Sequence, residues 1–536
     1  MQASTVTDLA VRRWAAVRPF LNIASSDVRN RGVAYSVLAL ASLVIFLFGP
    51  RFGSALEVIF GWVPFAAVFW VARKEVEAAM VRAVDGHPGI LLAVCLAIWA
   101  SVVVMRNPTA ADDLLRDLAV SAYGYNYHAM FVASSIPPQS MYPLFDHAVG
   151  IIAGAIGMYW AMHVVQILAF LAVFAPFLAL LCRNLPASNT RGVVLAFCMA
   201  IGFSCALGRV ALGRPEVFLT GWVLCALLVR SAWQVGLWVV AGMLLSMCHI
   251  FAPVYFASAA LLRVRRHWIV LAVVALLSFH VGFWEWYSHG MVMQWLDLGA
   301  AAVRNRQGQI QENMTIGLAF LQWSTLVTVA TVVWIFGLGR PKRGYEILAV
   351  AGWFLLSGQI RFASVVVLLL VLFVSETIPS DIPLLRAARW RVLLWGYAAV
   401  TLISTGWHLI PYDSLPAMAL PAGSRVLTTM GGNYAVLFHN AGRVRVAPAL
   451  ELGATDAVVQ RLSINMQEKG TLDCGPLEHF RFNVVVEDSL RMIPPCLTPL
   501  AVSGPWRAWR VTSAPGLVPG RPAAPARQPE WRDGHA

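Results

Sequence analysis

Residues 90–128 read ILLAVCLAIWASVVVMRNPTAADDLLRDLAVSAYGYNYH. The run from Ile90 to Met105 is almost entirely apolar, as expected of a helix that crosses a membrane. A carboxylate pair, Asp112 and Asp113, follows it, and then the aromatic string Tyr123–His128. Because carboxylates are costly to remove from water, a pair at the end of a span indicates chemistry at the membrane surface.

The composition of the chain agrees with a membrane setting. Hydrophobic residues make up 59% of the 536 residues, charged residues only 12%, and the mean hydropathy is +0.68. These values are far from those of soluble globular proteins and predict a polytopic membrane protein. The formal net charge of +13 does not indicate a nucleic-acid partner, since the basic residues fall largely in short connections between apolar runs.

Basic residues also set the orientation of the chain. Five arginines precede the first apolar run and predict that residues 1–32 form a cytoplasmic segment: Arg12, Arg13, Arg18, Arg29 and Arg31. The first apolar run lacks a convincing cleavage site directly after it, so we expect a retained anchor rather than a cleaved signal peptide.

Apolar runs predict a transmembrane domain of about 13 spans over residues 33–408. The expected spans are residues 33–49, 55–72, 89–105, 156–181, 192–207, 216–230, 235–249, 251–262, 268–286, 315–337, 345–357, 361–376 and 391–408. Basic residues then gather on one side, the cytoplasm, at Arg73, Lys74, Arg82, Arg183, Arg191, Arg230, Arg263, Arg265, Arg266, Arg340, Lys342, Arg343, Arg386, Arg389 and Arg391.

The opposite side of the membrane holds most of the unusual polar residues. It carries a first large loop at residues 106–150, a second loop at residues 287–314, and everything after residue 408. Several spans are shorter than the ~20 residues that a bilayer requires. Short or broken helices are tolerated where they line a cavity, so we expect a cavity on this non-cytoplasmic side.

Residues 409–513 predict a small periplasmic α/β domain, and residues 514–536, rich in Pro, Ala, Gly and Arg, a disordered tail. We expect a helix from Thr455, as its cap, to Lys469. We expect strands at residues 424–430, 434–438, 480–486 and 506–511, with a hairpin turn at 431–433 between the first two.

Cysteine usage fits this sidedness. Cys474 and Cys496 are the only two in the C-terminal domain, and an oxidising periplasm favours a disulfide between them. The remaining cysteines lie in or beside apolar runs, where a cysteine is usually a small hydrophobic residue.

The acidic pair of the first loop has three interpretations. Asp112 or Asp113 is suited to deprotonate a hydroxyl or to bind a divalent cation. Alternatively, since Arg116 follows them by four and three residues, either carboxylate would form an ordinary ion pair on a helix. The metal question stays open, and no HxxH or CxxC spacing indicates zinc.

Aromatic and basic residues supply the other candidates. Tyr123, Tyr125, Tyr127 and His128 are typical either of an aromatic belt at the membrane interface or of a sugar-binding surface. Glu216, which is also typical of a helix start after a proline, and His249 are further candidates for binding a sugar or an acceptor. Five arginines lie on the non-cytoplasmic side, against the excess of basic residues expected on the cytoplasmic side. They are typical of contacts with either a lipid headgroup or a bound phosphate: Arg209, Arg214, Arg304, Arg306 and Arg361.

This combination resembles the GT-C class of membrane glycosyltransferases: many spans, Ala111-Asp112-Asp113 in an early periplasmic loop, basic periplasmic loops and a periplasmic C-terminal domain. The resemblance implies a polyprenyl-phosphate-linked sugar as donor, an inverting displacement, and Asp112 or Asp113 as catalytic base, with Asp112 slightly favoured. It implies a bacterial inner membrane location with the active site facing the periplasm. A glycan, a lipid or a secreted protein such as a pilin is the implied acceptor, as for arabinofuranosyl- or mannosyltransferases.

Two other classes are alternatives. An O-antigen ligase or polymerase shares a lipid-linked donor, but its essential residues are expected in a late loop. A transporter is expected to show paired repeats of its span pattern and ionisable groups at the bilayer midplane, and the sequence shows no convincing repeat.

The topology generates a first prediction. In spheroplasts, Asp112→Cys reacts with a membrane-impermeant maleimide, because the loop faces the periplasm, whereas Arg265→Cys is labelled only after lysis. Both variants are made in a background without other free cysteines. A position 112 that is shielded until lysis would place the acidic pair inside the cell and rule out this arrangement.

Overall fold

The computed structural model describes residues 113–134, 142–186, 190–249, 252–262, 346–356, 362–379, 382–386, 390–391, 394, 398, 417–429, 432–449 and 455–512. The predicted spans 33–49, 55–72, 89–105, 268–286 and 315–337, the second loop, the terminal segments and nearly all of 391–408 lie outside these residues. The chain divides into two units. One comprises Met1–Leu91 with Pro383–Leu394, of which α22 (Pro383–Arg386) is described, and the other comprises Leu92–Ile382 with Trp395–Ala536.

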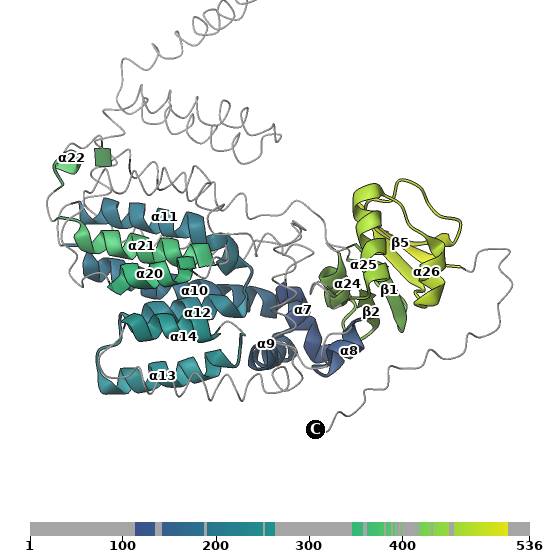
Figure 1. The fold of residues 1–536 in the computed structure, drawn as a ribbon, viewed down its shortest axis with the longest axis horizontal. Coiled ribbons are helices and arrows are strands. Elements are labelled where there is room, and N and C mark those ends of the chain that lie inside the picture. Colours follow the sequence, from purple (N-terminus) through teal and green to yellow (C-terminus); the bar gives the residue numbers. More distant parts are fainter. Residues whose placement is uncertain are drawn as a thin grey trace, which may run out of the picture. The chain divides into compact units, whose positions relative to one another are not determined.

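Helices form most of the larger unit as far as residue 377 (Figure 1). They are α7 (Asp113–Ala119), η2 (Val120–Tyr123), α8 (Tyr127–Met130), α9 (Pro143–Ile156), α10 (Met158–Asn184), α11 (Arg191–Ala211), α12 (Pro215–Ala226), α13 (Ala232–Ser246), α14 (Ala252–Leu262), α20 (Glu346–Leu356) and α21 (Ala363–Thr377). Each predicted span that falls within the described residues from 156 to 376 is a helix. Among the helices that the structure describes, α10 alone has the length and apolar composition to cross a membrane.

Small and aromatic residues let these helices approach closely. A Cβ atom at Gly221 of α12 would lie 2.1 Å from the carbonyl oxygen of Ala172 in α10, so only glycine permits this contact. Trp222 and Trp238 stack with ring centroids 4.5 Å apart, and each indole N–H donates to the other residue's carbonyl. The result is a tightly packed helical layer in which α10 contacts α9, α11 and α12, and α21 contacts α11 and α20.

Large apolar side chains also point away from this core. They lie on α9, α10 and α13 and include Ile151, Trp160, Leu168, Leu171, Trp233, Leu237 and Leu244. Exposed apolar side chains of this size and number on three helices suit a lipid environment.

The C-terminal domain contains a five-stranded mixed sheet with the order β2-β1-β3-β5-β4. Its elements are β1 (Ser424–Thr428), α24 (Asn433–His439), β2 (Val444–Ala447), α25 (Ala457–Ile464), η5 (Asn465–Lys469), α26 (Cys474–His479), β3 (Val484–Glu487), β4 (Leu497–Ser503) and β5 (Trp506–Val511). Strands β2, β1 and β3 are parallel, whereas β5 runs antiparallel to both β3 and β4. The predicted α/β character is therefore found.

The predicted hairpin is wrong. Residues 434–438 belong to helix α24, and β1 pairs with the parallel strand β2 instead. Parallel neighbours need a crossover, which α24 supplies. The run Tyr434–Phe438 is buried on every side, and periodicity does not separate a fully buried helix from a buried strand.

The other predicted elements need smaller corrections. The helix after Thr455 is capped by Asp456, whose carboxylate accepts the Val458 N–H, while the Thr455 hydroxyl bonds with Ala449. Its last turn is a π turn ending at Gly470, which adopts the left-handed conformation with φ 63°. The strand predicted at 480–486 begins only at Val484, and β2 and β4 were not predicted. Strand β4 contains Pro499, which is tolerated at the edge of a sheet.

One hydrophobic core joins the first loop to the C-terminal domain. Leu114, Leu118 and Tyr127 pack with Tyr434 and Val446, all almost fully buried. A second core lies on the other face of the sheet, between the strands and helices α25 and α26. The segment after α8 also reaches the sheet edge, where the Val132 N–H donates to the Val446 carbonyl at 2.8 Å.

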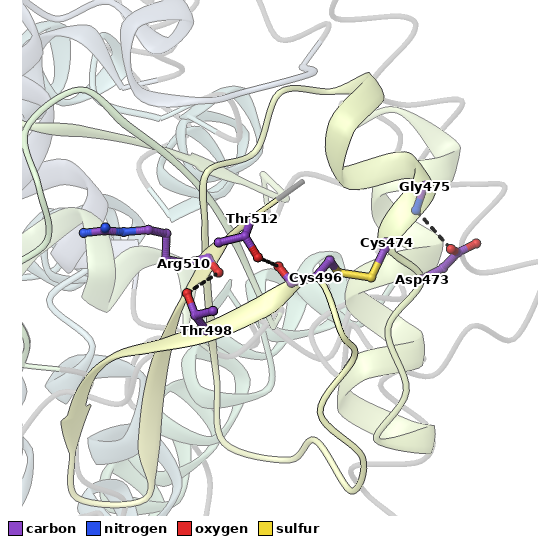
Figure 2. The surroundings of a disulfide bond; sticks show 7 residues. All are labelled: Asp473, Cys474, Gly475, Cys496, Thr498, Arg510 and Thr512. Atoms are coloured by element: carbon purple, nitrogen blue, oxygen red, sulfur yellow. Dashed lines mark hydrogen bonds between the residues drawn. A yellow bond between two sulfur atoms is a disulfide. The ribbon is translucent and has the colours of Figure 1, made fainter. Parts of the chain in front are cut away.

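Figure 2 shows the disulfide between Cys474 and Cys496, as predicted. It joins the first residue of α26 to the residue before β4. The Thr512 N–H donates to the Cys496 carbonyl at 2.8 Å, and Asp473 caps α26 by accepting the Gly475 N–H. The bridge thereby anchors an edge strand to the helix that precedes β3.

The disulfide generates a second prediction. Replacing both cysteines by serine lowers the free energy of unfolding of the C-terminal domain by about 3 kcal/mol, because the unfolded chain loses a loop constraint. The loss is measured as a lower thermal midpoint of the full-length protein in detergent. Dithiothreitol reproduces this loss in the native protein and has no effect on the double variant. A native protein whose midpoint is insensitive to reductant would contradict a stabilising bridge.

Candidate active site at helix α7

Helix α7 buries charged residues together with its leucines. Arg116 and Asp117 follow Asp113 by three and four residues, which places both beside it on the helix surface, while Leu114, Leu115 and Leu118 enter the core. Arg116 and Asp117 are only 2% and 1% exposed. Charges this deeply buried must be paired and hydrogen-bonded to be tolerated.

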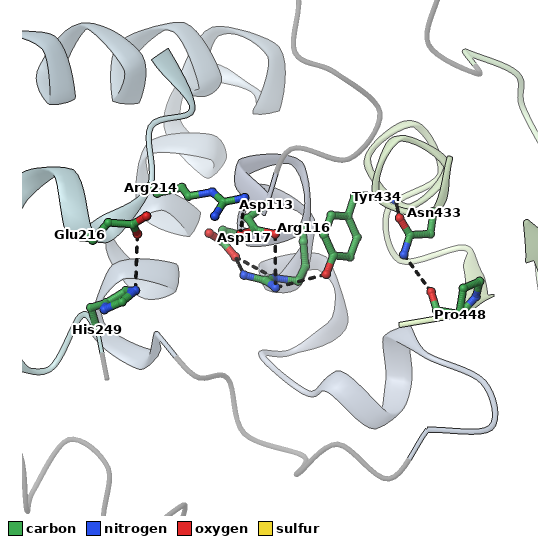
Figure 3. Close-up of polar contacts among 9 residues, drawn as sticks. All are labelled: Asp113, Arg116, Asp117, Arg214, Glu216, His249, Asn433, Tyr434 and Pro448. Carbon is green, nitrogen blue, oxygen red and sulfur yellow. Dashed lines mark hydrogen bonds and ion pairs between the residues drawn. The ribbon is translucent and has the colours of Figure 1, made fainter. Parts of the chain in front are cut away.

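Arg116 is the centre of these contacts (Figure 3). Its Nε and Nη2 atoms donate to Oδ1 of Asp117 at 2.9 and 2.8 Å, and its Nη1 donates to the Tyr434 hydroxyl at 3.3 Å. The rings of Tyr127, Tyr142 and Tyr434 surround the guanidinium with centroids 5.8, 5.3 and 5.3 Å from Cζ. This aromatic cage fixes the position of a cation in the first loop.

Burial changes the proton affinities around Arg116. It raises the pKa of Asp117 to about 7, an effect that Arg116 opposes and Asp113 reinforces. It also raises the pKa of the Tyr142 hydroxyl, again against the influence of Arg116. Asp117 therefore titrates near neutral pH.

Asp113 lies between two arginines. Its Oδ2 atom is 3.0 Å from Nη2 of Arg214, and its Oδ1 atom is 3.8 Å from Nη1 of Arg116. The turn between α11 and α12 directs Arg214 to this position, because Gly213 has φ 63° and a Cβ there would lie 2.8 Å from Leu114 of α7. The Gln166 side chain holds the start of the same turn by donating to the Ala211 carbonyl.

A second group of polar residues adjoins Arg214 in sequence. Glu216, in the first turn of α12, lies 3.1 Å from Arg209 and 3.4 Å from Nε2 of His249. The His249 ring stacks on Tyr142 with centroids 5.3 Å apart. Tyr142 therefore contacts both groups, since it also covers Arg116.

The structure thus brings together five predicted site residues: Asp113, Arg209, Arg214, Glu216 and His249. Asp112, Arg304, Arg306 and Arg361 lie outside the described residues. The expected ion pair between Arg116 and Asp113 is present at 3.8 Å, but Arg116 lies closer to Asp117, at 2.8 Å. Within the described ranges no three His, Cys, Asp or Glu side chains gather as metal ligands would.

The aromatic string lies beside the C-terminal domain. The Tyr123 hydroxyl donates to the Val444 carbonyl at 2.6 Å, and Tyr127 is buried in the shared core. Tyr125 is half-buried and stacks on His147 at 3.8 Å, while His128 is exposed and its carbonyl accepts from Arg445. Tyr123 and Tyr127 thus have clear packing contacts, and Tyr125 and His128 keep accessible surface.

Three residues at the centre of the site were not predicted: Asp117, Tyr142 and Tyr434. Asp117 directly follows Arg116, and the spacings of three and four that usually signal a helical ion pair pointed to Asp113 and Asp112 instead. Tyr434 comes from a segment 318 residues away, and nothing in the local sequence indicates its contact with Arg116.

Comparison with known proteins finds similar solved structures, two of which are described below. No family model and no curated protein matches the chain. The arabinofuranosyltransferase AftD from Mycobacteria, in a cryo-EM structure of a mutant, is 15% identical with a TM-score of 0.46, over 79% of this chain and 41% of that chain. ArnT from Cupriavidus metallidurans, bound to undecaprenyl phosphate, is 12% identical with a TM-score of 0.47, over 78% of this chain and 97% of that chain.

The buried carboxyl of Asp117 generates a third prediction. Its pKa is about 3.8 when exposed and about 7 in the folded protein, so the folded state binds the extra proton between these values. The stabilisation that this proton gives the folded state is fully present below about pH 4 and is lost as the pH rises through about 7. The thermal midpoint of the native protein should therefore fall, relative to that of Asp117→Asn, as the pH is raised from about 5 to about 8.

The matched control is Asp473→Asn, which preserves a helix cap at an exposed site and should follow the native pH profile. A native midpoint that rises with pH relative to Asp117→Asn would show that the carboxylate is the stable buried form.

Proposed function

We propose that this chain is a membrane glycosyltransferase that moves a sugar from a polyprenyl-phosphate donor to a hydroxyl of a periplasmic acceptor. The observation that carries the proposal is the position of Asp113, held between Arg116 and Arg214. A carboxylate beside fixed cations supplies both functions that the reaction needs, a base for the attacking alcohol and positive charge for the leaving phosphate.

The reaction is a single displacement at the anomeric carbon. An aspartate accepts the proton of the acceptor hydroxyl while its oxygen forms a bond to the sugar. The bond between the sugar and the phosphate oxygen breaks, and the phosphate departs with the electron pair, so the anomeric configuration inverts. Asp113 is the base among the described residues, and Asp112, its neighbour in sequence, is the alternative.

The leaving phosphate is assigned to Arg209 and Arg214. Both flank the turn between α11 and α12, and each is held by a carboxylate, Glu216 for Arg209 and Asp113 for Arg214. Pairing of this kind fixes a guanidinium before the ligand arrives, which lowers the reorganisation that phosphate binding requires. Arg304, Arg306 and Arg361 are further candidates for the same phosphate.

Asp117 and Tyr434 act through Arg116 in this scheme. Both hydrogen-bond to its guanidinium, and neither is accessible. They are positioning residues, because they fix the cation that adjoins Asp113. The pair Glu216 and His249, with Tyr125 and His128, is assigned to the sugar or the acceptor.

The proposed location is the bacterial inner membrane with the site facing the periplasm. The apolar outer surface of α9, α10 and α13 supports the membrane, and the disulfide in the C-terminal domain supports an oxidising compartment. The acceptor is a glycan, a lipid or a secreted protein.

One assay separates this function from its alternatives. Purified protein is incubated with radiolabelled polyprenyl-phosphate sugars and candidate acceptors, and the loss of label from the lipid is followed. A ligase or polymerase would instead release glycan from a pyrophosphate-linked carrier, and a transporter would consume neither donor.

The assay generates a fourth prediction. Asp112→Asn and Asp113→Asn are compared, and the variant that removes the base lowers transfer by about 10²- to 10⁴-fold with unchanged folding. Asp473→Asn serves as the matched control, since it makes the same change at an exposed acid of the C-terminal domain. Full activity in both loop variants would eliminate the acidic pair as the source of the base.

A further inference from the structure

A second group of arginines lies in the C-terminal domain, separate from the contacts of Arg116. Arg425 and Arg445 are paired in register on the neighbouring parallel strands β1 and β2. Arg481 lies in the turn before β3, with a left-handed backbone at φ 56°. Arg425 and Arg481 line a cavity of about 690 Å³, together with His479, Phe480 and Asp456.

None of these three guanidinium groups forms an ion pair with a carboxylate in the part of the chain that the structure describes. Nη2 of Arg425 donates to the Phe480 carbonyl at 2.9 Å, and Nη2 of Arg445 donates to the carbonyls of His128 and Phe131. The Nε atoms of both arginines are buried without a hydrogen-bond partner. Two buried donors and three cations are thus left without a counter-charge.

The single carboxylate in the cavity wall has another role. Asp456 caps helix α25 by accepting the Val458 N–H at 2.8 Å. Burial, together with the charges of Arg445 and Arg481, lowers the pKa of Arg425. Positive charge without a partner in a concave site is the arrangement that binds an oxyanion.

We propose that this cavity binds the phosphate or carboxylate group of an anionic saccharide, with Arg425 and Arg481 as its charged contacts. The cavity is too large for a bare phosphate and falls in the range of small-molecule sites. Phe480 is one of the lining residues, and an aromatic side chain suits the apolar face of a sugar ring. The saccharide part of the inference rests on the proposed function, whereas the anion part rests on the arginines alone.

The cavity wall includes Ala133 and Ser134, which follow the segment that pairs with the edge of β2. These residues belong to the same loop as Asp113. A ligand in the cavity therefore contacts both the C-terminal domain and the loop that carries the candidate base, which is the position expected for an accessory site that holds an acidic acceptor glycan.

The test measures binding without turnover, so that its failure is distinct from failure of the transfer assay. Full-length protein in phosphatidylcholine nanodiscs is titrated calorimetrically at low salt with glucose 6-phosphate, glucuronate, inorganic phosphate and glucose. All titrations use protein that carries Arg214→Gln, because phosphate bound at the candidate active site would otherwise add to the measured heat.

We expect glucose 6-phosphate or glucuronate to bind more tightly than either inorganic phosphate or glucose. Arg425→Gln and the exposed Arg481→Gln should each weaken this binding about tenfold or more, the effect of losing a charge-assisted hydrogen bond. Arg507→Gln, an exposed arginine of β5, is the matched control and should leave the affinity unchanged.

Three results would overturn the inference. The first is the absence of binding by both anionic sugars. The second is binding that survives Arg425→Gln and Arg481→Gln in folded protein. The third is loss of sugar binding when phosphatidylglycerol replaces phosphatidylcholine in the nanodiscs, which would assign the cavity to a lipid headgroup.

Discussion

The fold of the site depends on one buried cation. Arg116 is almost inaccessible, and three separate parts of the chain hold it: Asp117 beside it, Tyr127 and Tyr142 in the same loop, and Tyr434 from the C-terminal domain. A buried guanidinium that loses its hydrogen-bonding partners is strongly destabilising, by about 3–5 kcal/mol, because the desolvated charge remains. The loop and the domain must therefore form together, and the geometry of Asp113 follows from this joint packing.

The polar residues of the site alternate in charge from Asp117 through Arg116 and Asp113 to Arg214, and from Arg209 through Glu216 to His249. Alternation keeps each carboxylate next to a cation, so a cluster of charges is tolerated where water is scarce. It also means that an anionic ligand competes with a protein carboxylate for the same arginine. In the proposed reaction, binding of a phosphate at Arg214 would release Asp113 from its ion pair with that arginine. Arg425 and Arg481, which line the cavity, have no such carboxylate among the described residues. An anion would therefore bind there without displacing a carboxylate of the protein, in contrast to the site at Arg214.

The sequence predicted the elements whose signals are local. Apolar runs predicted every described helix between residues 156 and 376, and strand β5 has its predicted range. The disulfide was predicted because an oxidising compartment favours a bond between the two cysteines of the C-terminal domain. The prediction failed where long-range packing decides. The apolar run at Tyr434 is helical because two parallel strands need a crossover, and the role of Asp117 depends on a tyrosine contributed by the distant C-terminal domain. Charge placement alone pointed to Asp113, Arg209 and Arg214, which the structure places in one group of contacts, since a charged residue at an unexpected position in a membrane protein is visible without a structure. The sequence did not identify the ion-pair partners of these residues, because the fold decides which side chains meet.

The contact between Arg116 and Tyr434 has a consequence for biosynthesis. The two residues are 318 positions apart, so at roughly 5 to 20 residues per second the loop waits roughly 15 to 60 s before its partner has been synthesised. Throughout this interval the arginine has no aromatic cover from the domain, and the leucines of α7 face an unfinished interior. A nascent chain in this condition is exposed to proteases and to wrong association until the C-terminal domain has been synthesised.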